Sequence, residues 1–146
     1  MALKVSTGLR NAMLTTGSLK SRLDTGFIKI YAGAVPATAD DTLASATLLC
    51  TITKNGDGVT GLTMATPAVN GTLSKAVETW AGTNVTSGTA SFWRYVRPGD
   101  TGATSTTEER LQGLAATAGA ELVMTSVTLA GGATQNIDYF AVALPA

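Results

Sequence analysis

The sequence predicts a mainly β protein, built as an antiparallel β-sandwich or jelly roll with a short helical N-terminal arm. Short segments with the two-residue period of strands recur along the chain. Turn signals separate them about every 8–12 residues, which is typical of such folds. Threonine, which favours strands, makes up about a sixth of the chain, and sixteen glycines supply turns. At 146 residues with 45% apolar content, the chain can bury one core. We therefore expect an arm at residues 1–25 and a single β-sandwich domain at residues 26–146.

The N-terminal arm is expected to hold two short helical pieces. Ser6 or Thr7 can cap a helix over residues 6–15, which Gly17 ends, and Ser18 can cap a second turn. Pieces this short do not persist alone in water, so the arm must lie on its own sandwich or on a partner subunit.

The charge of the arm makes it a candidate docking element. Residues 1–24 carry a formal charge of +3, which leaves −3 for the remainder of a neutral chain. Such an arm can dock on a neighbour or on its own body, and a solvated helix face is an equally good interpretation. The candidate partner contacts are its apolar and basic side chains: Leu9, Arg10, Met13, Leu19, Lys20, Arg22 and Leu23.

From Gly26 onward the pattern has the period of two that is typical of strands. Asn55-Gly56-Asp57-Gly58 and Asn70-Gly71 have the composition of hairpin turns. Residues 34–46 and 98–107 are expected to be loops. The expected strands cover residues 27–32, 47–54, 62–65, 73–80, 88–97, 110–114, 121–124, 127–129 and 137–144.

The strand at residues 88–97 is expected to be central, because both of its faces carry large apolar side chains. Phe92 and Arg94 alternate with Trp93 and Tyr95. We expect Phe92→Ala or Trp93→Ala to cost the most stability, about 3–5 kcal/mol. Arg94 shares a face with Phe92 and could mark a rim, a buried ion pair or an interface.

The composition argues against an enzyme. The chain has no histidine, which removes the common triads, the usual zinc ligand sets and the usual neutral-pH base. The lone Cys50 is expected to be a buried hydrophobe. The pairs Asp40-Asp41 and Glu108-Glu109 are expected to be solvated loop residues. We expect no catalytic, cofactor or metal site.

Two classes of partner are also disfavoured. The net charge is zero, so no nucleic-acid partner is expected. No stretch approaches the roughly 20 apolar residues of a membrane span, and no signal peptide is evident. Sugar binding through aromatic residues is a further alternative, with Trp80 the best candidate for exposure, although aromatic residues on strands are more often core.

The sequence also resembles a family of small virion proteins of tailed bacteriophages and prophages. The resemblance covers nearly the whole chain. The residues that carry it are Ser6-Thr7-Gly8-Leu9-Arg10-Asn11, Gly26, Ile28, Ile30, Tyr31, Gly33, Pro36, Ala37, Ala39, Asp40, Leu48, Leu49, Gly88-Thr89-Ala90, Phe92, Arg94, Ser105-Thr106-Thr107, Arg110, Gly113, Gly119-Ala120-Glu121-Leu122 and Leu144-Pro145-Ala146.

The resemblance implies a capsid cement or decoration protein, which binds the lattice of the major capsid protein and stabilises the head. It implies a place on the capsid exterior of a virion assembled in the bacterial host cytoplasm. It brings no active-site motif. Homo-oligomers, dimers or trimers, are expected from the symmetry of such shells. A tail or head–tail junction protein and a receptor-binding or glycan-binding virion module remain alternatives.

Overall fold

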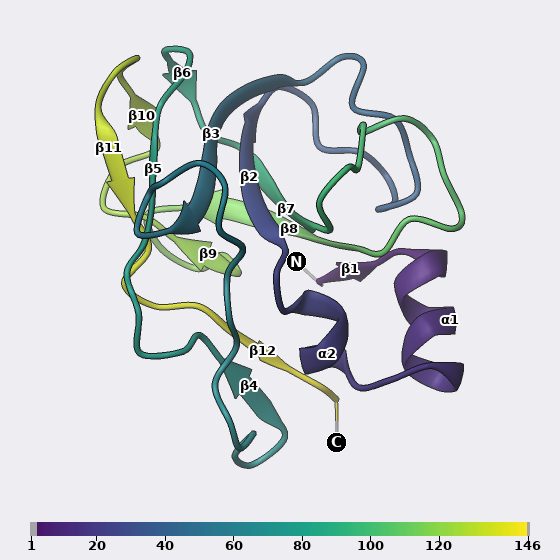
Figure 1. Cartoon of the computed structure of the whole chain (residues 1–146). Coiled ribbons are helices and arrows are strands. Elements are labelled where there is room, and N and C mark those ends of the chain that lie inside the picture. The colour runs from purple at the N-terminus through teal and green to yellow at the C-terminus, as the bar shows by residue number, and fades with distance from the viewer. Residues whose placement is uncertain (1–2, 146) are drawn as a thin grey trace.

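The computed structural model describes residues 3–145 and shows a mainly β protein with two short helices (Figure 1). The helices are α1 (Thr7–Thr15) and α2 (Leu19–Leu23). The strands are β1 (Lys4–Val5), β2 (Phe27–Ala32), β3 (Thr47–Lys54), β4 (Thr72–Ser74), β5 (Trp80–Thr83), β6 (Gly88–Thr89), β7 (Phe92–Val96), β8 (Arg110–Ala116), β9 (Leu122–Val123), β10 (Thr128–Leu129), β11 (Thr134–Asn136) and β12 (Ala141–Ala143).

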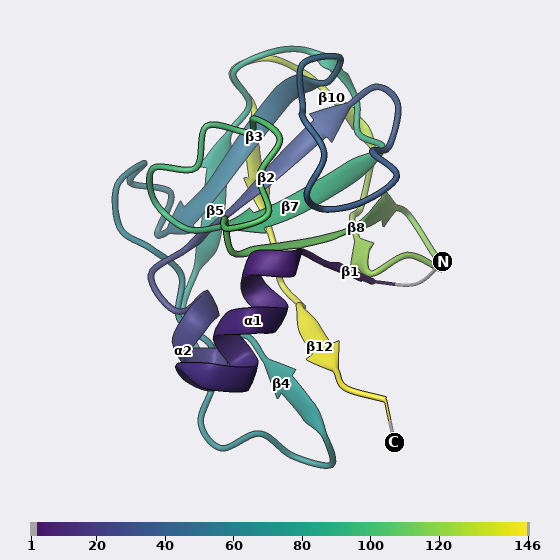
Figure 2. The ribbon, with the colours of Figure 1, turned by 90° about the vertical axis from the view of Figure 1, so that its right-hand side faces the viewer.

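The strands form one large sheet and two small ribbons. The order of the large sheet is β1-β8-β7-β2-β3-β5-β11, with β9 parallel to the end of β8 and the other pairs antiparallel. The ribbons pair β10 with β6 and β12 with β4. Figure 2 shows the β4–β12 ribbon below the large sheet, on the same side of it as the two helices.

The N-terminal segment belongs to this body and is not a free arm. The strand β1 pairs with β8, and the Ser6 side chain caps α1 by accepting from the Leu9 N–H at 3.1 Å. Leu9 and Leu23 are 0% and 2% exposed within the main core. The helices are stable because their apolar faces are buried on the chain's own sheet. Of the two alternatives, the chain's own body or a partner subunit, the structure therefore shows the first.

Several expected strands differ in extent from those observed. The stretch at residues 88–97 is divided into β6 and β7, because Ala90 N–H bonds to Val127 in one ribbon while Ser91 N–H bonds to Tyr31 in the large sheet. Residues 62–65 form only an isolated bridge at Met64, and of the expected strand at 137–144 only β12 (Ala141–Ala143) forms, while β11 (Thr134–Asn136) precedes it. These divisions depend on which distant segment pairs with each residue, which local alternation does not encode.

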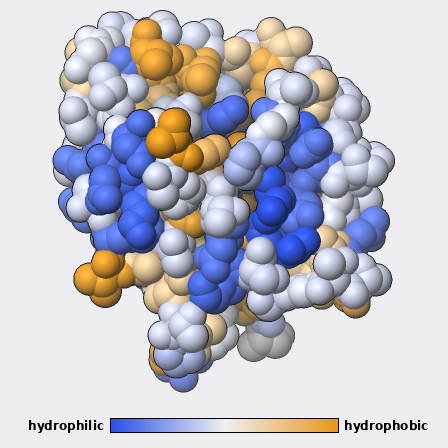
Figure 3. All heavy atoms as spheres, in the orientation of Figure 1, coloured by the Kyte–Doolittle hydropathy of each residue, from blue (hydrophilic) through white to orange (hydrophobic). Residues whose placement is uncertain are grey.

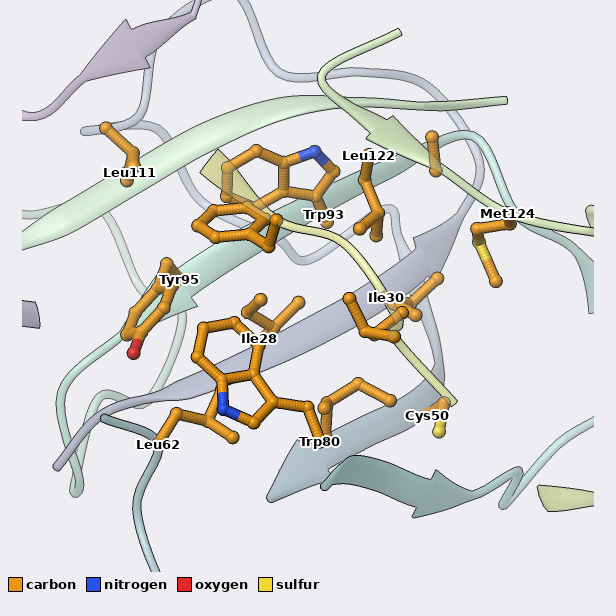
Figure 4. Packing of buried hydrophobic residues seen from close by; sticks show 14 of the residues in the cluster. Ile28, Ile30, Cys50, Leu62, Trp80, Trp93, Tyr95, Leu111, Leu122 and Met124 are labelled. Carbon is orange, nitrogen blue, oxygen red and sulfur yellow. The ribbon is translucent and has the colours of Figure 1, made fainter. Parts of the chain in front are cut away.

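The main core lies on one face of the β2–β7–β8 part of the sheet. Phe140 is its hub, with ring centroids 5.2 Å from Trp93, 5.7 Å from Trp80 and 6.0 Å from Tyr95. Figure 4 shows the labelled rings pointing toward one another over Ile28. Gly113 makes room for this cluster, since a Cβ there would lie 2.7 Å from the Trp93 indole.

The opposite face of the same strands is covered by the two long loops, residues 33–46 and 97–109 (Figure 1). Two buried arginines fasten these loops. Arg110 forms a bidentate pair with Asp100, at 2.6 and 2.7 Å, and donates to the Ala103 carbonyl at 2.8 Å. Bidentate pairing of this kind is strong and directional, so it fixes the second loop on the sheet.

Arg94 holds the first loop. Its Nε donates to Gln112 Oε1 at 2.7 Å, and its Nη2 donates to the Asp41 carbonyl at 2.9 Å. Gln112 in turn donates to the Pro36 carbonyl at 3.0 Å. Arg94 was expected at a rim, in a buried ion pair or at an interface. It is buried, and its guanidinium donates to loop carbonyls and to the Gln112 amide instead of pairing with a carboxylate. Burial, and next the nearby Arg110 charge, lower the pKa of Arg94 to about 10, so the guanidinium stays charged at neutral pH.

Candidate partner-binding surface

The charged side chains of the N-terminal segment bind the chain's own body. Asp40 in the first loop accepts from the Thr7 N–H at 2.8 Å at the start of α1, where a carboxylate is favoured. Burial alone would raise the pKa of Asp40, but the Thr7 hydrogen bonds and the nearby Arg10 charge outweigh it and lower that pKa. Arg22 pairs with Glu109 at 3.4 Å, and its carbonyl accepts from Arg97 at 3.0 Å. Of the basic side chains of this segment, Arg22 thus pairs with an acidic loop residue, whereas Lys20 pairs with Asp24 inside the segment.

The seven predicted partner contacts divide into two groups. Leu9 and Leu23 are buried in the core, so they cannot touch a partner, and their prediction as contacts is corrected. Their helical spacing signalled a buried face, and that face covers the chain's own sheet. Arg10 is exposed, and the remaining four, Met13, Leu19, Lys20 and Arg22, are half-buried.

Leu19 and Lys20 lie at an apolar pocket of about 240 Å³ between α2 and the β4–β12 ribbon. The ribbon side of the pocket is formed by Ala68, Gly71, Leu73, Val142 and Leu144. Asn70 and Gly71, both with positive φ, form the tight hairpin turn that the sequence predicted. This turn places exposed Val69 directly beside the pocket-lining residue Ala68.

The chain segments around this pocket carry almost no charge. Residues 11–19, 64–74 and 139–145 contain no Asp, Glu, Lys or Arg. Lys20, which lines the pocket, is paired with Asp24 at 2.5 Å, one turn later on α2. Val69 is 61% exposed and Leu144 is 59% exposed. An uncharged surface with exposed aliphatic groups loses little solvation free energy when another protein covers it.

The ribbon residues of this pocket were not predicted as site residues. Their pairing, Leu73 with Val142, joins segments 69 residues apart in the chain. The only local signals were the Asn70-Gly71 turn and the closing Leu144-Pro145, neither of which indicates the other.

A second groove, of about 580 Å³, lies between residues 74–79 and 138–140. Two of its three charged lining residues are engaged within the chain: Lys75 donates to the Glu78 carbonyl, and Glu78 accepts from Thr63 N–H and Trp80 Nε1 and pairs with Lys54. The third, Asp138, is exposed. Burial alone would raise the pKa of Glu78, but these hydrogen bonds outweigh it and lower that pKa.

Trp80, the best candidate for an exposed aromatic residue, is buried, which is the more usual outcome for aromatic residues on strands. Its side chain is 1% exposed, because it packs on Phe140 and its Nε1 donates to Glu78 at 2.8 Å. Tyr31, Trp93 and Tyr95 are also buried, and Tyr139, at 74%, is the aromatic residue that reaches solvent within the described part of the chain. A sugar-binding platform built on Trp80 is therefore not formed.

The remaining reactive groups have structural roles. Cys50 is fully buried, as expected, and burial raises the pKa of its thiol to about 11. Asp40 and Glu109 bind the N-terminal segment, so these two are more engaged than the solvated loop residues that the sequence predicted.

Figure 3 shows that hydrophobic residues on the face of Figure 1 form small groups separated by hydrophilic ones.

Comparisons of the chain with protein-family models, with curated protein sequences and with solved structures gave no match. Among residues 3–145, no helix is both long and apolar enough to cross a membrane.

Proposed function

We propose that this chain is a non-enzymatic capsid cement or decoration protein of a tailed bacteriophage, which binds the major capsid protein lattice on the outside of the head. The observation that carries the proposal is the nearly uncharged pocket between α2 and the β4–β12 ribbon, whose charged lining residue, Lys20, is paired with Asp24, with Val69 and Leu144 exposed beside it. A surface of this kind suits contact with protein, since burying it requires no compensating charge.

The phage-like residues support the proposal through the fold. Pro36, Asp40, Arg94 and Arg110 meet in the layer that fastens the two loops to the sheet. They act as anchors, which fits a family whose members share a shell-binding scaffold in place of catalytic residues. Within the proposal the mainly β body is classed as a jelly-roll-like sandwich, and copies of it associate as dimers or trimers.

A bound cement subunit stabilises a shell because it contacts only the assembled state. Repetition over many equivalent sites lets a small interface act through avidity. A tail or head–tail junction protein is the alternative that shares this chemistry, and copy number separates the two.

The test uses charge insertion at the pocket. We expect Val69→Asp and Leu19→Asp to lower cosedimentation with capsids lacking the protein by at least about tenfold, because each places an unpaired charge in the interface. Leu19 begins α2, where an acidic residue is compatible with the helix. Val85→Asp is the matched control, since Val85 is also exposed (68%). It lies between β5 and β6, away from the β4–β12 ribbon (Figure 1). Equal cosedimentation of all three variants would contradict the proposed surface.

A further inference from the structure

The strand β12 presents an unpaired edge. It bonds only to β4 among the described strands. The backbone N–H and C=O groups of its even-numbered residues point toward β4. The hydrogen bonds from Lys75 N–H to the Phe140 carbonyl, at 2.9 Å, and from Leu144 N–H to the Gly71 carbonyl, at 3.0 Å, show this. In an antiparallel pair the intervening residues turn their peptide groups the other way. Ala141 and Ala143 therefore direct their N–H and C=O groups away from β4.

We infer that two copies of this chain form a two-fold dimer by antiparallel pairing of β12 with β12. If Val142 lies on the two-fold axis, Ala141 of each copy lies opposite Ala143 of the other. Both residues present outward groups, so the two N–H and two C=O groups of each edge all find partners. The edge is self-complementary without any rearrangement of the chain.

The side chains around this edge permit close approach. Ala141 and Ala143 are small, and residues 139–145 and 64–74 carry no charge that would repel a second copy. Leu144 is 59% exposed at the end of the strand, next to the proposed junction. The edge of β11 differs, because Thr134, Gln135 and Asn136 are polar and Asp138 follows them.

Pro145 sets the extent of the pairing. It has no N–H, and it occupies the next outward-facing position after Ala143. The contact therefore ends after a short ladder, which closes a dimer and does not extend to open-ended strand addition.

Dimerisation would give the proposed function a bivalent form. A two-fold axis perpendicular to the joined ribbons keeps the pocket-lining faces of both copies on the same side. Two pockets would then meet the capsid lattice together, which raises the effective affinity of each. This consequence rests on the proposed function, whereas the dimer itself does not.

The first experiment measures the mass of the full chain in solution by analytical ultracentrifugation. We expect about twice the 14.8 kDa of one chain for the unaltered protein. Ala143→Pro removes an outward N–H without touching the β4 ladder and should yield monomers. Asn136→Pro removes the equivalent outward N–H of β11 and should leave the dimer intact. Circular dichroism and thermal unfolding verify that both variants fold.

The second experiment tests the register. Residues opposite one another in such a pair have Cα atoms about 5.5 Å apart, within the range of a disulfide. Under oxidation, a mixture of Ala141→Cys and Ala143→Cys proteins should give crosslinked dimers, and each protein alone should not. A monomeric native chain, a dimer that survives Ala143→Pro, or a mixture that does not crosslink would each overturn the inference. Loss of capsid binding with dimers intact would count only against the proposed function.

Discussion

At the scale of single residues, the Arg110–Asp100 pair is the interaction on which the loop-covered face depends most. Both side chains are almost completely buried, at 1% and 2% exposure. A buried pair costs solvation when it forms, so its presence alone is weak evidence of stabilisation. Removing one partner is different, because it leaves the other charge buried without compensation.

We therefore predict that Arg110→Met lowers the free energy of unfolding by about 3–5 kcal/mol. Lys20→Met, which breaks the partly exposed pair with Asp24, should cost less than about 1 kcal/mol. Urea unfolding of both variants measures the difference. Similar small losses in the two would show that the buried pair does not hold the loop.

Titration of the buried carboxylate gives a second prediction. Burial alone would raise the pKa of Asp100, but the hydrogen bonds from Arg110 and the Gly102 N–H outweigh it and lower that pKa. A group whose pKa is lower in the folded state contributes stability above its unfolded value, about 3.9, and loses it as the pH falls toward the folded pKa. Asp40 and Glu78 act in the same direction.

The free energy of unfolding should consequently be flat between about pH 5 and pH 8, because the chain has no histidine, and should fall below about pH 4. Urea unfolding at a series of pH values measures the profile. The acid loss should be smaller in Asp100→Asn, although that variant starts from lower stability. A slope between pH 6 and pH 8, or a profile that stays flat to pH 2.5, would contradict this account.

At the scale of elements, the docking of α1 shows that the helical N-terminal segment packs on the chain's own body. Gly8, in the first turn, lies against the second loop so closely that a Cβ would be 2.4 Å from the Thr107 carbonyl oxygen. The sequence predicted two short helical pieces in the N-terminal segment and left open whether they lie on the chain's own sandwich or on a partner; Leu9 and Leu23 are buried in the chain's own core. Because the segment contributes β1, Leu9 and Leu23 to the sheet and core, its deletion should disturb the fold.

Helix propensity and close packing make opposite predictions for Gly8→Ala. Propensity alone favours alanine by about 1 kcal/mol. The observed contact requires α1 to move away from the Thr107 backbone, so we predict a net loss of stability and faster proteolysis of the N-terminal segment. Asn11→Ala, on the exposed side of α1, should be neutral or slightly stabilising. A more stable Gly8→Ala would contradict the observed docking.

How far elements could be predicted depended on the range of the interactions that form them. Ser6 and Ser18 cap the two helices as expected, and the Asn70-Gly71 turn is present, because caps and turns are set by neighbouring residues. Asn55-Gly56 does not form a hairpin between adjacent strands, since β3 pairs with β2 and with β5. The pocket was missed for the same reason: its two sides are far apart in the sequence.

At the scale of the whole molecule, the charge asymmetry of the sequence is used internally. The N-terminal segment contacts the two loops through the Arg22–Glu109 pair and the Thr7–Asp40 hydrogen bond, and Lys20 pairs with Asp24. The surface between this segment and the β4–β12 ribbon is almost uncharged. The sequence left open whether the basic segment docks on a partner, docks on its own body or is a solvated helix face. The structure favours apolar contact, so we expect any assembly through this surface to be insensitive to salt.

The most direct test of the cement proposal is the copy number of this chain in purified particles of the phage that, under the proposal, encodes it. Quantitative mass spectrometry gives the ratio of this chain to the major capsid protein. We predict a ratio near one, or a simple fraction of one, as for a subunit repeated over the whole shell. A few copies per hundred capsid subunits would indicate a tail or connector protein, and absence from the particle would contradict a virion role.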